Sequence, residues 1–293
     1  MKQTAEKKKR NKPAAKEGPF AVLAAGLLVS TALVFSLLII FRHAPEPEKP
    51  VPPPAAYVPP ARSVPERALV FVIDDAGNNL HELEPFLLLD IPLTIAVLPG
   101  LPGSAEAARR AREAGKEVFL HQPMEAIGGQ NPGPGAIMAG MGRDEIRAII
   151  KQNLNEIGPV TGMNNHTGSR LTADEVAMET ILSLCSEMGI HFLDSRTTAR
   201  SVAPEVAGRL GITIAERDVF LDNDPSSESI LGYINVALQT AVEKNYAIMI
   251  GHAQSAALAP LIAGLLPDLK EKGFSFSTVS GIINMKRYES TWN

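Results

Sequence analysis

Short apolar runs alternate with amphipathic stretches between residues 68 and 287. The apolar runs predict strands at 68–74, 93–98, 117–121, 160–165, 191–194, 212–216, 247–251 and 274–279. Helical periodicity lies between them, near 104–114, 143–157, 173–188, 203–209, 228–244 and 257–271. This alternation is typical of βα units around a parallel sheet. Because no glycine-rich phosphate loop is present, the expected fold class is α/β, a distorted or seven-stranded (β/α) barrel rather than a dinucleotide-binding fold.

The first 67 residues follow a different pattern. Residues 1–19 form a basic tail, and every residue from 20 to 41 is uncharged. At about 1.5 Å per residue, such a helix spans a bilayer core. We expect an uncleaved signal anchor in the inner membrane, with the N-terminus cytoplasmic and the main domain periplasmic or extracytoplasmic, because the basic cluster precedes the span. A buried core helix is the alternative.

Proline-rich composition separates this segment from the rest of the chain. Residues 42–67 hold nine prolines and no periodic apolar pattern, which favours an extended linker. The expected organisation is therefore a tail at 1–19, an anchor at 20–41, a linker at 42–67, a domain at 68–287 and a short tail at 288–293.

Composition narrows the function classes. The net charge is −4, and no basic face emerges outside the N-terminal tail, so we expect no nucleic-acid partner. The chain has one cysteine, which excludes an intrachain disulfide and a cysteine-based zinc site. Cys185 falls on the apolar side of a predicted helix, where we expect a buried structural thiol.

Two adjacent carboxylates end the first predicted strand. Asp74 and Asp75 follow a run of β-branched and aromatic residues, at the end of a parallel strand where such folds bind ligands. Neighbouring acids need a cation, hydrogen bonds or a shared proton to compensate their charges. The pair therefore favours a metal site or an acid/base pair, and a turn-capping Asp is the structural alternative.

Further polar side chains stand at successive predicted strand ends. They are His121 and Glu125 after the third strand, Asn165, His166 and Arg170 after the fourth, Asp194 and Arg196 after the fifth, Asp218 and Asp222 after the sixth, and His252 after the seventh. Singly, each is typical of a helix cap or a buried hydrogen bond. Together, at one end of a barrel, they indicate a metal or hydrolytic centre. His43, His81 and His191 fall elsewhere and are not ligand candidates.

These residues resemble the polysaccharide deacetylases of the NodB-homology type, a carbohydrate esterase-type superfamily, and more closely their divergent branch. The resemblance covers roughly residues 66–287. It implies that Asp74 is a general base, that Asp75 is a metal ligand, and that His252, in Ile250-Gly251-His252, protonates the leaving group. His121 is followed four residues later by Glu125 instead of a second histidine.

The divergent branch is expected to supply its histidine from the next strand. The resemblance then implies a metal set of Asp75, His121 and His166, suited to Zn²⁺ or another divalent ion. The remaining polar residues would orient these ligands or contact substrate, with Arg170 pairing with an acid such as Asp194 or Asp218; this group comprises Glu125, Asn165, Arg170, Asp194, Arg196, Asp218 and Asp222.

The implied substrate is an acetylated envelope polysaccharide or peptidoglycan-related glycan, and the implied activity is metal-dependent hydrolysis of amide or ester acetyl groups. Two alternatives remain: a catalytically inactive glycan-binding or regulatory module of the envelope, and a hydrolase acting on a different bond. The glycine-rich segment 127–142 is either a lid or glycan-contacting loop above the site or an ordinary surface loop.

Overall fold

The fold is taken from a computed structural model, which describes residues 67–292. Within these residues, no helix combines the length and apolar character needed to cross a bilayer. The expected tail, anchor and most of the proline-rich linker lie outside the described residues.

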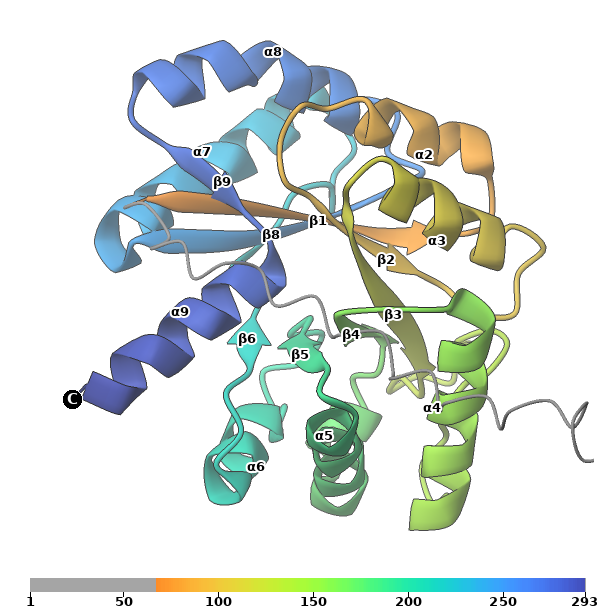
Figure 1. Ribbon diagram of the computed structural model, residues 1–293. Helices are drawn as coiled ribbons and strands as arrows, with labels where there is room; N and C mark the ends of the chain where they lie inside the picture. The colour runs from red at the N-terminus through yellow and green to blue at the C-terminus, as the bar shows by residue number, and fades with distance from the viewer. Residues whose placement is uncertain (1–66, 293) are drawn as a thin grey trace, which may run out of the picture. The chain divides into compact units, whose positions relative to one another are not determined.

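A parallel sheet forms the centre of the described part of the chain (Figure 1). Its strands follow the order β6-β5-β4-β3-β2-β1-β8-β7, and β9 pairs with β1 off this path. The strands are β1 (Ala68–Ala76), β2 (Thr94–Val97), β3 (Glu117–Met124), β4 (Gly162–Thr167), β5 (His191–Asp194), β6 (Ala215–Glu216), β7 (Val219–Phe220), β8 (Tyr246–His252) and β9 (Ser275–Ser277).

The two ends of this strand order belong to one short segment, residues 215–220. Its first half pairs with β5, through Leu193 and Asp194, and its second half pairs with β8. The backbone N–H of Arg217 still donates to Asp194 O at 3.0 Å, while that of Asp218 donates to Ile248 O at 2.8 Å. The segment therefore bridges β5 and β8, an arrangement consistent with the predicted (β/α) barrel. The strand count rises from the expected eight to nine because β7 is separate from β6, whereas β9 lies within the strand expected at 274–279.

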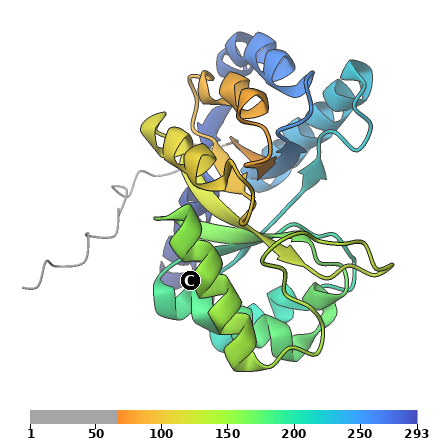
Figure 2. The same ribbon diagram turned by 90° about the vertical axis from the view of Figure 1, so that its right-hand side faces the viewer.

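Helices cover the outer face of the sheet (Figures 1 and 2). Outward side chains such as Leu69, Phe71 and Ile73 pack with the apolar faces of these helices in one large core. The helices are α2 (Leu80–Leu87), α3 (Ser104–Glu113), α4 (Arg143–Ile157), α5 (Glu175–Met188), α6 (Ala203–Leu210), α7 (Ser227–Lys244), α8 (Leu258–Glu271) and α9 (Val279–Trp292), with a 3₁₀ turn η1 (Leu171–Ala173). Cys185 is buried in this core, which confirms the prediction of a buried thiol.

A second, smaller core fills the inside of the sheet. Alternate residues of β1, Val70 and Val72, join inward side chains of the other strands and the apolar face of α9, including Ile282 and Ile283. Glu117, at the start of β3, accepts the backbone N–H of Val279 at 3.0 Å. Helix α9 is thus fixed at the amino-terminal end of the strands, and the carboxyl-terminal end is left for the polar residues.

Some elements differ from the sequence expectation. The strand expected at 212–216 is reduced to β6, and α9 falls where no helix was expected. Since α9 extends to Trp292, the expected boundary at 287 lies within a helix. The apolar residues of α9 face the barrel interior and are few, so their helical period is weak in the sequence.

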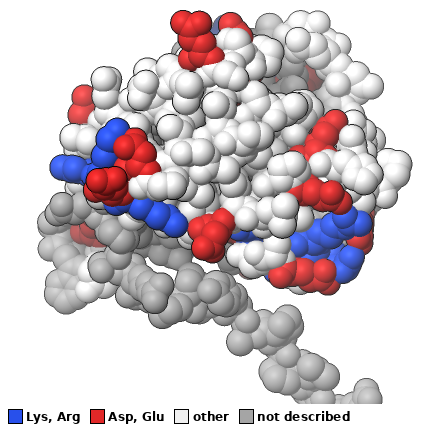
Figure 3. Space-filling view, turned by 90° about the horizontal axis from the view of Figure 1, so that it is seen from above, with Lys and Arg blue, Asp and Glu red and all other residues white. Residues whose placement is uncertain are grey.

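Exposed charges of opposite sign lie close together on the face seen in Figure 3. Arg109, for example, pairs with Glu106 at 2.7 Å and with Glu113 at 2.5 Å on α3. Such exposed pairs contribute little to stability, because solvent screens their charges.

Candidate metal centre

A bulge at the end of β1 brings Asp74 and Asp75 to the same side of the sheet. Regular strand alternation would point adjacent side chains to opposite faces. Against β2, however, the register advances from Ile73↔Ile95 to Ala76↔Val97, so β1 holds one extra residue. Asp75 takes a left-handed conformation with φ 61°, which Asp tolerates better than most residues. Both carboxylates therefore reach the carboxyl end of the barrel interior.

Asp75, His121 and His166 converge there from three strands. Asp75 Oδ1 lies 3.2 Å from His121 Nε2 and 3.0 Å from His166 Nδ1. The two ring nitrogens are 3.1 Å apart. Each residue offers one atom to a group whose members all lie within 4.8 Å of one another. Among the described residues, this is the group with the composition and spacing of a metal site.

The three side chains fit a divalent cation. Asp75 Oδ1 is buried and has no hydrogen-bond partner, although it faces two imidazoles. A carboxylate with two imidazoles is a donor set that Zn²⁺ accepts, with positions left for water and substrate. His121 Nδ1 lies 2.8 Å from Asn164 Oδ1, so the ring donates there and keeps its Nε2 lone pair for the site.

The carboxylates and imidazoles of the centre shift one another's pKa values. Burial alone would raise the pKa of Asp75, but the close approach of the His121 and His166 rings lowers it below its usual range. Burial lowers the pKa of His121, and the charges of Asp74 and Asp75 reverse this and raise it. The carboxylates thus favour positive charge between the imidazoles, which is the condition that a cation needs.

Asp74 and His252 lie on neighbouring strands beside this set. They are register partners in the β1–β8 pairing. Asp74 Oδ1 accepts from Asn164 Nδ2 at 2.9 Å, and Oδ2 lies 3.5 Å from His121 Nε2. Burial raises the pKa of Asp74 even though the charges of His121 and His252 oppose this effect. A buried carboxyl with a raised pKa is suited to accepting a proton.

Asp222 holds His252 in place. One carboxylate oxygen contacts His252 Nδ1 at 2.9 Å, and the other accepts the backbone N–H of His252 at 2.8 Å. Phe220 stacks on the imidazole ring, with centroids 6.0 Å apart. Burial lowers the pKa of His252, but Asp222 and Asp74 outweigh it and raise the pKa to about 9. The ring is thus favoured in its protonated form near neutral pH.

A cleft of about 440 Å³ opens beside Asp75 and His166. Its other walls come from the segments after β1, β2, β3 and β8, and its lining includes Asn78, Glu82, Leu98, Pro99, Leu101, Pro123, Asn131, Pro132, Gly133, Pro134 and Gln254. The glycine-rich loop 127–142, expected either above the site or at an unrelated surface, thus contributes residues 131–134 to this cleft. Figure 2 shows this connection between β3 and α4 as a long yellow-green loop.

Glu125 does not reach the three ligands. Its carboxylate pairs with Arg170 at 3.1 Å and accepts the backbone N–H of Ala139 at 2.6 Å. The sequence suggested that Arg170 pairs with Asp194 or Asp218. This prediction is wrong, because Arg170 pairs with Glu125. Both residues fasten the loop 127–142 to the segment after β4.

The other expected supporting residues also act at a distance. Asp194 is buried and accepts the N–H of Arg196 at 2.8 Å, while the Arg196 guanidinium pairs with Glu216 at 3.5 Å. Asn165 Oδ1 accepts the N–H of Ser195 at 2.9 Å. These contacts shape the strand ends without touching the ligand set.

Asp218 differs most from its expected place. It binds Lys244 and the backbone N–H of Ile248, partway along β8, and makes no contact with the ligands. The cause is the bridge at 215–220, which carries Asp218 to the middle of β8 rather than to a strand end.

Two site residues were missed from the sequence. Asn164 joins His121, Asp74 and Ser195, and Gln254 Nε2 donates to Asp75 Oδ2 at 3.1 Å. Asn164 directly precedes Asn165 and His166, and Gln254 follows His252 by two residues. Their positions at strand ends were the available signal. Amide side chains are common at such positions, so the prediction was based on the charged and histidine side chains instead.

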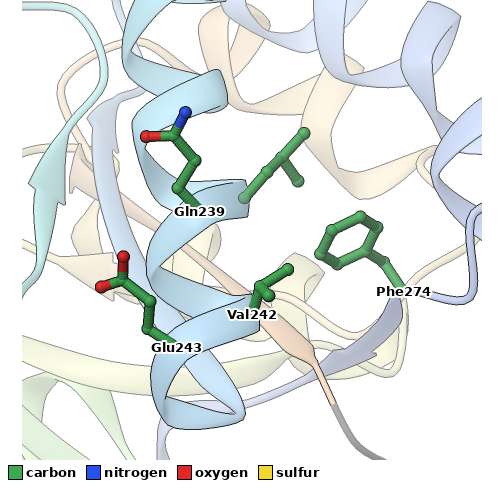
Figure 4. A pocket seen from close by; sticks show the side chains of 5 residues that line it. Gln239, Val242, Glu243 and Phe274 are labelled. Carbon is green, nitrogen blue, oxygen red and sulfur yellow. The ribbon is translucent and has the colours of Figure 1, made fainter.

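A second hollow of about 300 Å³ lies between α7 and Phe274 (Figure 4). Val242 points toward the Phe274 ring, whereas the Glu243 carboxylate points away from it. Leu238 and Gln239 complete its lining, and none of these residues belongs to the metal centre.

The fold and site define a class: a parallel α/β protein with a carboxylate and two imidazoles gathered at the carboxyl ends of its strands. A family model described as divergent polysaccharide deacetylase matches residues 71–283. The chain belongs to the divergent polysaccharide deacetylase family, as the sequence motifs indicated.

Two bacterial proteins are similar to this chain in sequence. It is 31% identical over 204 residues to the uncharacterized protein YibQ of Escherichia coli (strain K12), across 69% of this chain and 64% of YibQ. It is 30% identical over 202 residues to an uncharacterized protein of Haemophilus influenzae, across 68% of this chain and 72% of that one. The chain thus matches just under two thirds of the length of YibQ.

A solved structure shares the fold. The uncharacterized protein ATU2773 from Agrobacterium tumefaciens C58 superposes with a TM-score of 0.70 at 22% identity, covering 75% of this chain and 91% of that chain.

Proposed function

We propose that the protein is a metal-dependent deacetylase of an acetylated envelope polysaccharide, tethered to the inner membrane by residues 20–41. The observation that carries this proposal is the convergence of Asp75, His121 and His166 beside a buried carboxyl, Asp74, and an imidazole held by Asp222, His252. Family membership supports the same chemistry.

Asp75, His121 and His166 would hold the cation, with Zn²⁺ the best match to the donor set. A cation bound there would supply Lewis-acid activation of water and of the acetyl carbonyl. Asn164 keeps the His121 ring oriented for this role and holds Asp74 through its other side-chain group.

Asp74 and His252 would move the protons. Asp74 accepts a proton from water as the water oxygen adds to the acetyl carbonyl carbon. His252 donates a proton to the sugar nitrogen or oxygen as its bond to the acetyl carbon breaks. The products are acetate and a free amine or hydroxyl, and Asp222 stabilises the imidazolium before the transfer.

The cleft supports an uncharged glycan as substrate. Its lining in the described part of the chain has no Lys or Arg, and Asp75 and Glu82 are acidic. Anionic sugars would be repelled, whereas the amides of Asn78, Asn131 and Gln254 match hydroxyl and acetamido groups. The prolines offer flat apolar surfaces for sugar rings.

Metal analysis tests the centre first. The full chain, in mild detergent, would be analysed for bound metal as wild type and as His121→Ala and His166→Ala, with His81→Ala as matched control because that side chain is 87% exposed. We expect near-stoichiometric zinc in wild type and the control, and loss of it in the two site variants. Wild type that binds no supplied divalent metal would contradict the mechanism.

Acetate release then tests the activity. Wild type and Asp74→Asn would be incubated with acetylated chitooligosaccharides and with isolated envelope glycan. We expect acetate from wild type and a loss of about 100-fold or more in Asp74→Asn, the scale of a general base. If zinc and glycan bind but neither protein releases acetate, the non-catalytic envelope module replaces this proposal.

A further inference from the structure

One wall of the cleft is a loop without regular secondary structure. Residues 131–134 line the cleft across from Asp75 and His166, and they belong to the loop 127–142. A loop of this length that contains several glycines has few bonds of its own to fix its shape. Its position must therefore come from contacts with the rest of the domain.

Two buried amide side chains provide such contacts. Gln122 on β3 is 0% exposed and Asn153 on α4 is 3% exposed. Gln122 Nε2 donates to Gly135 O at 2.8 Å, and Asn153 Nδ2 donates to the same oxygen at 2.9 Å. Asn153 Nδ2 also donates to Gln122 Oε1 at 2.9 Å, so the two amides form one network with the loop carbonyl.

The network lies outside the barrel and does not touch the ligand set. Gln122 alternates with His121 along β3, so its side chain points to the helix-covered face. Burying two amides there is unfavourable unless their hydrogen bonds are satisfied. Apart from a bond to Pro123 O at 2.9 Å, the Gln122 and Asn153 donors are used within the pair and on Gly135 O.

The loop packs tightly against the rest of the domain at Pro134 and Gly135. Gly135 has φ +66°, and a Cβ added there would lie 2.4 Å from Asn153 Oδ1. The neighbouring Pro134 packs against Gly100, where an added Cβ would lie 2.4 Å from the proline ring. Both contacts hold the cleft-lining residues Pro132–Pro134 in one position.

We infer that Gln122 and Asn153 are positioning residues that fix the 131–134 wall and thereby set affinity for the glycan, without a part in the chemical step. This inference rests on the proposed deacetylase function. It predicts that the wall contacts the sugar chain, while a small ester that occupies only the acetyl position does not depend on it.

The test uses near-isosteric apolar variants of the full chain, Gln122→Met and Asn153→Leu. Thr180→Val is the matched control, because Thr180 is 2% exposed and bonds within its own helix, to Val176 O. Steady-state kinetics would be measured with N-acetylchitotetraose and with 4-nitrophenyl acetate. With the tetrasaccharide, we expect KM to rise about fivefold or more while kcat changes less than about twofold.

The ester kinetics and the control complete the pattern. We expect both positioning variants to retain wild-type kcat/KM with 4-nitrophenyl acetate, and Thr180→Val to match wild type with both substrates. A tetrasaccharide KM that stays at the wild-type value, or an equal loss with the small ester, would overturn the inference.

Hydrogen exchange separates this inference from the proposed function. In the positioning variants, we expect faster exchange in a peptide covering residues 130–138, and unchanged exchange at the end of β1. If wild type releases no acetate from either substrate, the proposed function fails, but the exchange comparison still decides whether the amide pair fixes the wall. Unchanged exchange in 130–138 would show that it does not.

Discussion

Asp75 combines an unusual backbone conformation with a ligand position. Its φ of 61° and the extra residue in β1 turn its carboxylate toward two imidazoles. Left-handed backbone in a non-glycine residue costs of order 1 kcal/mol and persists where the surroundings enforce it. The sequence predicts that two acids end this strand, but strict alternation would separate them, so the bulge could not be foreseen.

Gln254 provides a test of how the ligand is oriented. Its Nε2 donates to Asp75 Oδ2 at 3.1 Å, which leaves Oδ1 directed at the imidazoles. We expect Gln254→Leu to weaken zinc binding about fivefold, less than the roughly 10- to 100-fold typical of such supporting contacts, because this one is exposed. Competition with a chromogenic chelator measures the affinity directly.

Gln239→Leu is the control for that comparison. Gln239 lies on α7 beside the second hollow and lines no part of the metal centre. Equal zinc affinity in wild type and Gln254→Leu would show that Asp75 is oriented without the amide.

Asp222 is the one carboxylate that both hydrogen-bonds to His252 and raises its pKa. Together with the charges of Asp74 and Asp75, it raises the pKa of His252 to about 9 against the effect of burial, so the protonated ring is favoured below that pH. In Asp222→Asn the charge is lost, and the pKa of His252 should fall by about one unit or more. The alkaline limb of the pH–rate profile should therefore move to lower pH. An unshifted limb would mean that another group donates the proton.

At the scale of elements, α9 is anchored by a side chain from a distant strand. Glu117 on β3 accepts the N–H of Val279 at 3.0 Å and the hydroxyl of Ser280, and it also contacts Thr94 Oγ1 at 2.6 Å. A carboxyl group at a helix N-terminus satisfies backbone donors that the helix cannot use itself. Glu117 thus shares the first-turn donors of α9 with Thr94 Oγ1, which accepts the Val279 N–H at 3.2 Å, and Thr278 Oγ1, which accepts the Gly281 N–H at 3.3 Å.

Two substitutions of Glu117 should show how much its hydrogen-bond acceptor and its charge each contribute to stability. Glu117→Leu removes the carboxylate that accepts from the Val279 N–H and the Ser280 hydroxyl, and we expect a loss of about 2 kcal/mol in the free energy of unfolding. Glu117→Gln keeps an acceptor and should lose less. Urea denaturation followed by circular dichroism measures both, and equal stability of the Leu variant and wild type would contradict the capping role.

The pH dependence of Glu117 has a defined sign. Burial raises the pKa of Glu117, although its hydrogen bonds to Ser280 and Thr94 oppose the shift. A carboxyl with a raised pKa in the folded state costs stability as pH rises above its unfolded value, about 4.3. The stability of Glu117→Gln relative to wild type should therefore increase between pH 4 and pH 8. A difference that falls over this range would contradict the assignment.

The sequence predicted elements better where their apolar pattern was long. Strands β1, β3 and β8 and helices α4, α5 and α7 lie close to the expected ranges, because each buries a continuous apolar face. A single strand was expected at 212–216, and the pairing of residues 219 and 220 with β8 was not foreseen, because two residues on each of two partner strands leave no periodic signal. Helix α9 was missed because it is anchored by Glu117, a contact between residues far apart in the chain.

For the whole molecule, Cys185 is a reporter of unfolding. It is the one cysteine in the chain, it is buried, and burial raises the pKa of its thiol to about 12. We expect no reaction with a thiol reagent at pH 8 in the native protein, and one equivalent after denaturation. The labelling rate in increasing urea should follow the unfolding curve. Rapid labelling without denaturant would show that the large core opens locally around α5.

At this scale the sequence also predicted which residues gather at the site better than it predicted the contacts of the surrounding residues. Strand order brings the ends of β1, β3, β4 and β8 to one edge, so Asp75, His121, His166 and His252 could be grouped in advance. The partners of Glu125, Arg170 and Asp218 depended on the loop 127–142 and the bridge at 215–220. Neither segment has a pattern that specifies its path.

Helix α9 and the candidate site occupy opposite ends of the barrel. Residue 67 joins β1 beside β9 and the start of β8, at the same end of the barrel that α9 fills. The candidate metal site lies at the other end of β1, about 20 Å away at the usual rise of a strand. The preceding chain therefore joins this domain at the end of β1 opposite to the candidate site, so a change at that junction can be made without touching the cleft.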